Sequence, residues 1–470
     1  MQRFSRWLAV LPLLPFLLSA AAPSATEPPP NILLIVSDDQ GWRDLGCFGS
    51  KGILTPRLDQ LAREGVRATS FYVTWPACTP SRGSILTGRY PQRNGLYDMI
   101  RNDMVNYGHR YTETEYATSP EMTLGMDVRE VMISQVLRQV GYRCGAVGKW
   151  DGGRARRFLP LQRGFDFFYG FANTGIDYYT HERYGIPSMF RGNERTTADR
   201  GTYATTLFQR EAARFLRENR ERRFFLYLAF NAPHGASTFA DNAARPGANV
   251  GVQAPAESLA KYPERNPTNG VTRYLAAVTC MDAAIGELLD LLRELGLEQN
   301  TLVMFFSDNG GSGNGGNAPL RGAKGTLFEG GLRVPFITRW PGHIPANTET
   351  AELLTTLEVF PSLLAAAGVK VPTGLALDGF DMLPVLQGKA KSGRSEMFWQ
   401  MREAKAARVG SHKWVESAKG GGLFDLSADP GEKTDLSTAR PALADQLKER
   451  FAGWRKQMDA AEPRGPFRDY

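Results

Sequence analysis

Short, almost purely apolar runs recur along the chain, and polar residues follow each of them closely. Four runs have the length of strands: residues 31–37 (NILLIVS), 144–147 (CGAV), 224–230 (FFLYLAF) and 301–307 (TLVMFFS). Runs without a regular apolar–polar alternation are typical of strands buried on both faces of an α/β sheet. Between and after them, the spacing of apolar residues predicts helices at residues 56–64, 131–140, 272–295 and 357–367.

This order of elements predicts an α/β fold, with a large, mostly parallel or mixed sheet sandwiched by helices. From about residue 347 the pattern changes to shorter segments, such as residues 422–426. We interpret this part as a smaller α+β subdomain that contains a short antiparallel sheet. The predicted domains are therefore residues 28–346 and 347–470.

The first residues have the pattern of an export signal. Arg3 and Arg6 precede a short apolar stretch, and the small residues Ala20–Ala22 follow it. The pattern predicts a signal peptide over residues 1–25. A membrane anchor is the weaker interpretation, because the stretch is too short to span a bilayer and two prolines interrupt it. We expect an exported protein, periplasmic or secreted, without a membrane segment after cleavage.

The composition of the chain excludes few classes of function. The 470 residues are 42% hydrophobic and 22% charged, and 56 basic and 49 acidic residues leave a net charge of +7. That excess is small for the length and contains no polybasic tract, so we expect no nucleic-acid partner. Export would permit two disulfides among Cys47, Cys78, Cys144 and Cys280, and no Cys-x-x-Cys pair suggests structural zinc.

Polar and ionisable residues follow the predicted strands. They are Asp38 and Asp39 after the first strand, Lys149 after the second, His234 after the third, and Asp308 and Asn309 after the fourth. Ligands bind at the carboxyl ends of strands in open α/β sheets. The sequence therefore predicts one site at one edge of the sheet.

Four of these residues have the chemistry of a metal site. Asp38, Asp39, Asp308 and Asn309 offer oxygen ligands, which suit Ca²⁺ or Mg²⁺ better than zinc. The alternative is capping of strand ends, a common use of Asp and Asn. Two such pairs, together with the segment that begins at Cys78, favour the metal.

The segment CTPSR at residues 78–82, followed by LTG at 86–88, resembles the signature of the type I sulfatases of the alkaline-phosphatase-like superfamily. Three further motifs are similar to that family: GKW at 148–150, APH at 232–234 and KGTLFEGG at 324–331. The resemblance runs from about residue 31 to 341 and continues weakly to 436.

The resemblance implies that a separate maturation enzyme oxidises Cys78 to formylglycine. One hydroxyl of the hydrated aldehyde attacks sulfur, and the other allows the adduct to collapse and expel sulfate. Arg82, one helical turn after Cys78, would hold the nucleophile and a carboxylate in place. Calcium or magnesium would bind to Asp38, Asp39, Cys78, Asp308 and Asn309.

The same resemblance assigns further catalytic groups. Lys149 and Lys324 would bind sulfate oxygens, and His234 would protonate the leaving oxygen. Most sulfatases continue Gly-Lys-Trp with His, whereas this chain has Asp151. An ionised Asp accepts a proton but donates none. We expect Asp151 either to take the role of that histidine or to slow the release of sulfate.

The predicted function is hydrolysis of a sulfate monoester by an enzyme of the arylsulfatase type. The substrate is expected to be a sulfated carbohydrate or an aryl sulfate. One alternative is a phosphate or phosphonate monoester hydrolase of the same superfamily. The other is a non-catalytic protein that binds sulfated glycans, which the presence of Cys78, Arg82 and both lysines disfavours.

Overall fold

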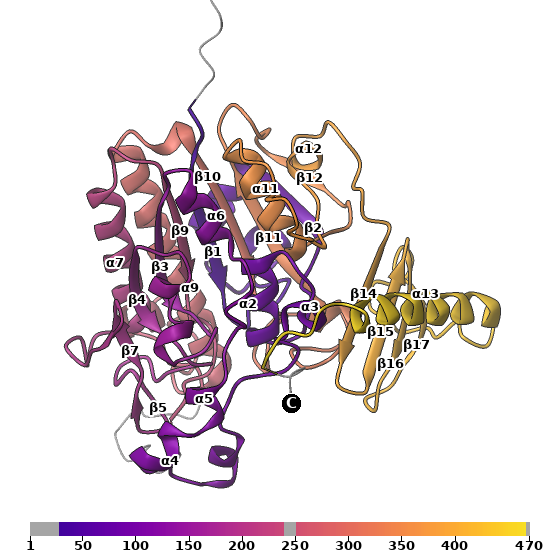
Figure 1. Ribbon diagram of the computed structural model, residues 1–470, viewed down its shortest axis with the longest axis horizontal. Helices are drawn as coiled ribbons and strands as arrows, with labels where there is room; N and C mark the ends of the chain where they lie inside the picture. Colours follow the sequence, from indigo (N-terminus) through magenta and orange to yellow (C-terminus); the bar gives the residue numbers. More distant parts are fainter. Residues whose placement is uncertain (1–27, 239–250, 467–470) are drawn as a thin grey trace, which may run out of the picture.

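The computed structural model describes residues 28–238 and 251–466, so the predicted signal peptide at 1–25 lies outside the described residues. A sheet of eleven strands runs through the main body (Figure 1). Its strands are β1 (Asn31–Ser37), β2 (Val66–Tyr72), β3 (Arg143–Lys149), β4 (Phe167–Phe171), β7 (Met189–Arg191), β8 (Glu194–Arg195), β9 (Phe224–Ala229), β10 (Thr301–Ser307), β11 (Arg333–Arg339), β12 (Thr348–Thr350) and β13 (Leu354–Thr355). A separate two-stranded ribbon joins β5 (Glu182–Arg183) to β6 (Ile186–Pro187).

The strand order is β12-β2-β11-β10-β1-β9-β3-β4-β7-β8, and β13 also pairs with β2. The five central strands from β10 to β4 are parallel, whereas β11 is antiparallel to both of its neighbours. Every residue of β1, β9 and β10 is buried, as their unbroken apolar runs predict. The predicted mixed α/β sheet is confirmed.

Helices cover both faces of the sheet (Figure 1). Leu33 and Ile35 of β1 pack with α1 (Pro56–Arg63), α7 (Ala204–Glu218) and α9 (Gly270–Glu294). The alternate residues Ile32 and Leu34 pack in the other core layer, with α2 (Cys78–Thr87), α6 (Ile133–Gln139) and α11 (Val359–Ala366). Shorter helices are α3 (Pro91–Asn94), α4 (Glu113–Ala117), α5 (Pro120–Thr123), α8 (Ala256–Leu259), α10 (Glu329–Leu332) and α12 (Leu383–Leu386).

A second, antiparallel sheet lies beside the large one near the end of the chain (Figure 1). It contains β14 (Glu396–Met401), β15 (Ala404–Val409), β16 (His412–Glu416) and β17 (Gly422–Asp425), and α13 (Pro441–Asp459) packs on it. The predicted short antiparallel sheet is confirmed.

The strands β12 and β13, which precede this sheet, pair with β2 of the large sheet. The first residues after position 347 therefore add to the main body. The division into domains at residues 346 and 347 stays a prediction. In the described part of the chain, no helix is both long and apolar enough to cross a membrane.

Candidate active site

The residues that follow β1 and β10 lie together because these strands are adjacent, parallel and in register, with Ser37 opposite Ser307. Asp39 N donates to Asp308 Oδ1 over 3.3 Å, and Asn309 Nδ2 donates to Asp39 Oδ1 over 2.8 Å. All four predicted metal ligands from these strand ends are at most 2% exposed. Three carboxylates and one amide thus occupy a single buried cluster at the sheet edge.

Cys78 is the first residue of α2 and is fully buried. Its Sγ lies 3.4 Å from Asp38 Oδ1, and ligand atoms of Asp38, Asp39, Cys78 and His234 all lie within 4.8 Å of one another. Burial and the Asp38 carboxylate raise the pKa of the thiol. The structure therefore places residue 78 against the carboxylate cluster as a protonated thiol.

Arg82 follows one turn later on α2 and is 1% exposed. Its Nε and Nη2 contact Asp308 Oδ2 at 2.9 and 2.8 Å, and Nη2 lies 3.8 Å from Asp38 Oδ1. Nη1 donates to the carbonyl of Lys149 and to the hydroxyl of Tyr227. This side chain therefore ties α2 to the ends of three parallel strands.

Two ammonium groups balance the carboxylates. Lys149 Nζ lies 2.7 Å from Asp38 Oδ2, and Lys324 Nζ lies 2.7 Å from Asp39 Oδ1 and 3.3 Å from Cys78 Sγ. Although burial by itself lowers it, the Asp38 carboxylate holds the pKa of Lys149 above its usual value. Both lysines are therefore cationic beside residue 78, where a tetrahedral anion would bind.

His234 lies at the open side of the cluster. Its Nε2 is 3.8 Å from Asp39 Oδ2, and its Nδ1 lies 2.6 Å from the carbonyl oxygen of Gly235. Burial and then the Lys324 ammonium lower the pKa of His234 to about 3. The side chains of His234 and Lys324 are each 21% exposed, whereas Lys149 is inaccessible. The leaving group of a substrate would thus project past His234 and Lys324.

Asp151, two residues beyond Lys149, lies on a closed side of the cluster, where its side chain is 2% exposed. The Thr79 hydroxyl donates to Asp151 Oδ1 over 2.8 Å. Its Oδ2 is 3.8 Å from Lys149 Nζ and accepts no hydrogen bond from the described residues. Burial raises the pKa of Asp151 to about 6, against the lowering effect of Lys149. Asp151 Oδ2 is therefore available to accept a proton, and the carboxylate lies beside Thr79, the residue that follows Cys78.

The donor set fits a hard divalent cation. Asp38, Asp39, Asp308 and Asn309 bring oxygen atoms to one buried place, which suits Ca²⁺ or Mg²⁺. Asn309 Oδ1 is buried and accepts no hydrogen bond within the described part of the chain, although its amide nitrogen donates twice. A buried carbonyl oxygen without a donor costs free energy, and a cation would satisfy it.

Sequence reasoning missed two residues that contact this cluster. Tyr227 lies in β9 and accepts from Arg82, and Thr79 donates to Asp151. A hydroxyl inside the otherwise apolar run FFLYLAF was the available signal for Tyr227. All four cysteines are free thiols.

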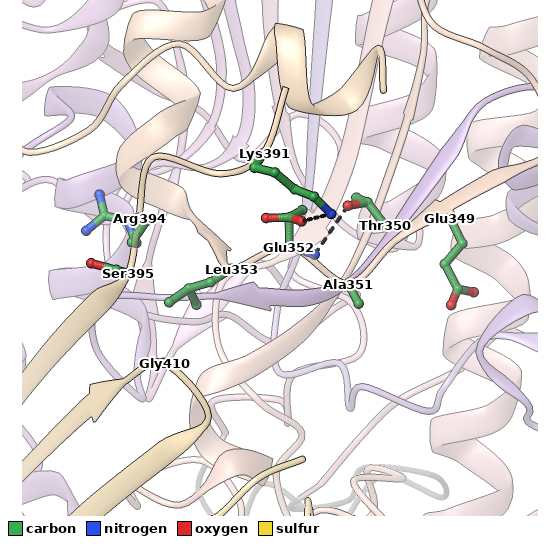
Figure 2. A pocket seen from close by; sticks show the side chains of 9 residues that line it. All are labelled: Glu349, Thr350, Ala351, Glu352, Leu353, Lys391, Arg394, Ser395 and Gly410. Carbon is green, nitrogen blue, oxygen red and sulfur yellow. Dashed lines mark hydrogen bonds and ion pairs between the residues drawn. The ribbon is translucent and has the colours of Figure 1, made fainter. Parts of the chain in front are cut away.

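A surface pocket elsewhere in the described part of the chain shares no residue with this cluster. Figure 2 shows it between the segment at Thr350–Leu353 and the start of the C-terminal sheet, with Arg394 and Ser395 in its wall. Lys391 pairs with Glu352 there at 3.1 Å. The pocket contains no group that the predicted chemistry uses.

Two family models match the chain. The model described as "Sulfatase" matches residues 30–369, and the model described as "N-sulphoglucosamine sulphohydrolase, C-terminal" matches residues 323–457. The first covers more than half of the chain and contains every predicted site residue.

Known proteins resemble the chain over most of its length. The N-acetylgalactosamine-6-sulfatase of Canis lupus familiaris is 32% identical over 89% of this chain and 84% of its own. Arylsulfatase A of Homo sapiens is 32% identical over 96% and 92%. The crystal structure of Ps i-CgsB in complex with k-i-k-neocarrahexaose superposes with a TM-score of 0.77 at 30% identity, covering 90% of this chain and 92% of the other.

Proposed function

The chain belongs to the sulfatase family and is a sulfuric ester hydrolase, and we propose that it cleaves the sulfate ester of a sulfated carbohydrate through formylglycine made from Cys78. The products are an alcohol and sulfate. The observation that carries the proposal is the position of Cys78 at the start of α2, in contact with both Asp38 and Lys324.

The buried cluster supplies a site for the sulfate group. Lys149, which pairs with Asp38, and Lys324, which contacts residue 78, bind its oxygens as compact cations. The N-terminus of the ten-residue helix α2 adds the positive end of a helix dipole. Three positive groups at one place favour binding of a sulfate ester, which carries one negative charge. They stabilise the transition state more than the bound substrate, because negative charge builds on the leaving oxygen.

Two groups complete the site when they are present. Asp38, Asp39, Asp308, Asn309 and residue 78 would hold calcium or magnesium, which would supply positive charge for the oxygens of the sulfate group and the nucleophile. Formylglycine supplies the nucleophilic hydroxyl. Arg82 contacts Asp308 and lies close to Asp38. It therefore holds both metal-ligand candidates in place, so that the site needs no large rearrangement to bind the cation.

Protons move at the two sides of the cluster. His234 protonates the leaving oxygen at the open side, because the negative charge of a bound sulfate ester favours the imidazolium. Asp151 accepts a proton from residue 78 at the closed side, where its Oδ2 has no hydrogen-bond donor among the described residues. In this proposal Asp151 replaces the histidine that most sulfatases carry after Gly-Lys-Trp.

The substrate class rests on the relatives. The two curated relatives are named for N-acetylgalactosamine-6-sulfate and aryl sulfate chemistry, and Ps i-CgsB was crystallised with a carrageenan oligosaccharide. We infer that a sulfated glycan binds with its sugar beyond His234 and Lys324. We also infer export through the signal peptide at residues 1–25 and maturation by a formylglycine-generating enzyme.

The test compares aryl sulfate, aryl phosphate and a panel of sulfated sugars, with protein produced alongside a maturation enzyme. The expected result is turnover of sulfates far above that of phosphates. Cys78→Ala should abolish turnover and leave binding of sulfated glycan. A Cys78→Ala variant that hydrolyses sulfate at the wild-type rate would reject the proposed mechanism, and faster phosphate hydrolysis would reject the substrate class.

A further inference from the structure

The segment that carries Lys324 is anchored at its other end by a residue of the C-terminal sheet. Lys413 of β16 lies 2.9 Å from Glu329 Oε1 and 3.0 Å from Glu432 Oε1. All three side chains are completely buried. The backbone N–H of Glu329 also donates to Glu432 Oε2 over 2.6 Å. One lysine thus joins two carboxylates across the contact between the main body and the second sheet.

Other groups complete the surroundings of these carboxylates. Tyr72 of β2 donates to Glu329 Oε2, Arg333 lies 3.7 Å from the same oxygen, and Arg408 of β15 donates to the Tyr72 hydroxyl. Arg321 donates to the backbone carbonyl of Glu432 and lies over the Phe328 ring. In the described part of the chain, Lys413 is the one cationic side chain that forms an ion pair with both Glu329 and Glu432.

The segment between the anchor and the site has little room to deform. Gly330 N donates to Arg321 O over 2.7 Å, and Gly325 N donates to Pro76 O over 2.8 Å. A Cβ added at Gly331 would lie 2.2 Å from the carbonyl oxygen of Thr326. The bond from Gly330 to Arg321 and the close packing at Gly331 link Glu329 to the turn that carries Lys324, so we expect a shift of Glu329 to be transmitted to Lys324.

The same sheet also holds the segment that leads into Cys78. Trp399 of β14 donates to the carbonyl of Val73 over 2.7 Å, and Trp75 donates to the carbonyl of Gln400 over 2.9 Å. Both indoles are buried. The C-terminal sheet therefore contacts the two chain segments that bring Cys78 and Lys324 together.

We propose that Lys413 is a positioning residue of this enzyme, which fixes the Lys324 ammonium beside residue 78 by pairing with Glu329 and Glu432. The inference rests on the proposed function, in which Lys324 binds the sulfate group. Lys413 itself touches no substrate. It acts through the segment 321–332, and residues far from the chemistry control rate when they set such distances.

The first test replaces Lys413 with Met, which keeps the length of the side chain and removes its charge. Glu329 and Glu432 then face each other without the cation, and their repulsion grows as Glu432 ionises; burial and Glu329 already raise the pKa of Glu432 to about 7. The deficit in kcat/KM toward 4-nitrophenyl sulfate should be within about threefold at pH 6 and reach about tenfold or more at pH 9. A purely structural role gives the same deficit at both pH values.

Two further variants separate positioning from loss of stability. Adding Glu432→Gln to Lys413→Met removes one negative charge and should remove the growth of the deficit with pH. Arg394→Met is the matched control, because Arg394 pairs with the buried Glu358 beside the pocket of Figure 2, and the hydrogen-bond partners of its side chain, Glu358, Asp378 and Met397, lie outside the segment 321–332. It should lower the melting temperature and leave kcat/KM nearly unchanged.

Hydrogen–deuterium exchange gives a measurement that does not depend on activity. In Lys413→Met, amides of residues 321–332 should exchange faster, whereas those of β1 and β10 should not change. Unchanged exchange in 321–332, or a deficit that neither pH nor Glu432→Gln alters, would overturn the proposal. If the wild-type protein hydrolyses no sulfate, the proposed function fails, and exchange alone still decides whether Lys413 positions this segment.

The variant Glu432→Ala covers the case in which Lys413→Met does not fold. It leaves the Lys413–Glu329 pair electrically balanced and removes the acceptor of the Glu329 N–H. Faster exchange across 321–332 and a lower kcat/KM are expected here as well. Wild-type exchange and wild-type kcat/KM in this variant would contradict the anchor.

Discussion

Replacing Asp151 with Asn should make the protein more stable and much less active. The carboxyl of Asp151 is 2% exposed, and burial raises its pKa from 3.8 to about 6. A shift of about 2 units at about 1.4 kcal/mol per unit means that keeping this group ionised costs the folded state about 3 kcal/mol. Asn has the same shape, can still accept from the Thr79 hydroxyl, and carries no charge.

The direction of the pKa shift of Asp151 determines how the gain in stability depends on pH. Between pH 3.8 and about 6 the folded state binds more protons at Asp151 than the unfolded state does, so wild-type stability falls as the pH rises. The advantage of Asp151→Asn should be near zero below pH 4 and reach its full value of up to about 3 kcal/mol above pH 6. Urea unfolding in the presence of a chelator, at pH 4.5 and pH 8, measures both values.

Activity should move in the opposite direction. An amide cannot accept the proton from residue 78, and loss of a general base lowers kcat by about 10²- to 10⁴-fold. Steady-state hydrolysis of 4-nitrophenyl sulfate at pH 8 gives that ratio. Equal or lower stability at pH 8, or a gain that is the same at both pH values, would refute the energetic argument. Wild-type kcat would refute the role of Asp151 as a base.

Further predictions concern the other side chains of the cluster. Arg82→Met should lower the free energy of unfolding by about 3–5 kcal/mol, since Asp308 is then left buried without its cation; urea unfolding checks this. Removing calcium with a chelator should abolish turnover and lower the melting temperature, and calcium at about 1,000 times its dissociation constant should restore about 4 kcal/mol of stability. His234→Gln should slow sulfates with poor leaving groups by about 10²-fold or more and nitrophenyl sulfate much less, as a series of substituted phenyl sulfates would show.

The fold was predictable where burial alone sets the sequence pattern. The strands β1, β9 and β10 are almost entirely apolar because both of their faces are covered. By contrast, β2 has the sequence VRATSFY, with two half-exposed positions. Nothing in the local sequence of β11 shows that it lies between β2 and β10 and runs antiparallel to both. Apolar runs report burial, whereas strand order depends on crossovers that no local pattern encodes.

The site residues were predictable one by one, but their partners were not. The resemblance of their motifs to those of sulfatases singled out Cys78, Lys149 and Lys324, and in the structure each of them contacts Asp38 or Asp39. The anchoring lysine lies in the strand HKWVE, whose polar and apolar residues do not alternate regularly, so the sequence does not show which face Lys413 occupies. Lys413 is buried because Glu329 and Glu432 meet it from two distant segments, and such long-range pairing leaves no trace in the strand itself.

Mass spectrometry of the peptide that contains residue 78 tests the central claim most directly. Preparations made with varying amounts of maturation enzyme will differ in the fraction of residue 78 present as aldehyde. We predict that kcat toward an aryl sulfate rises in proportion to this fraction and extrapolates to zero for the thiol. A preparation that contains only Cys78 and hydrolyses sulfate esters at the full rate would contradict the account.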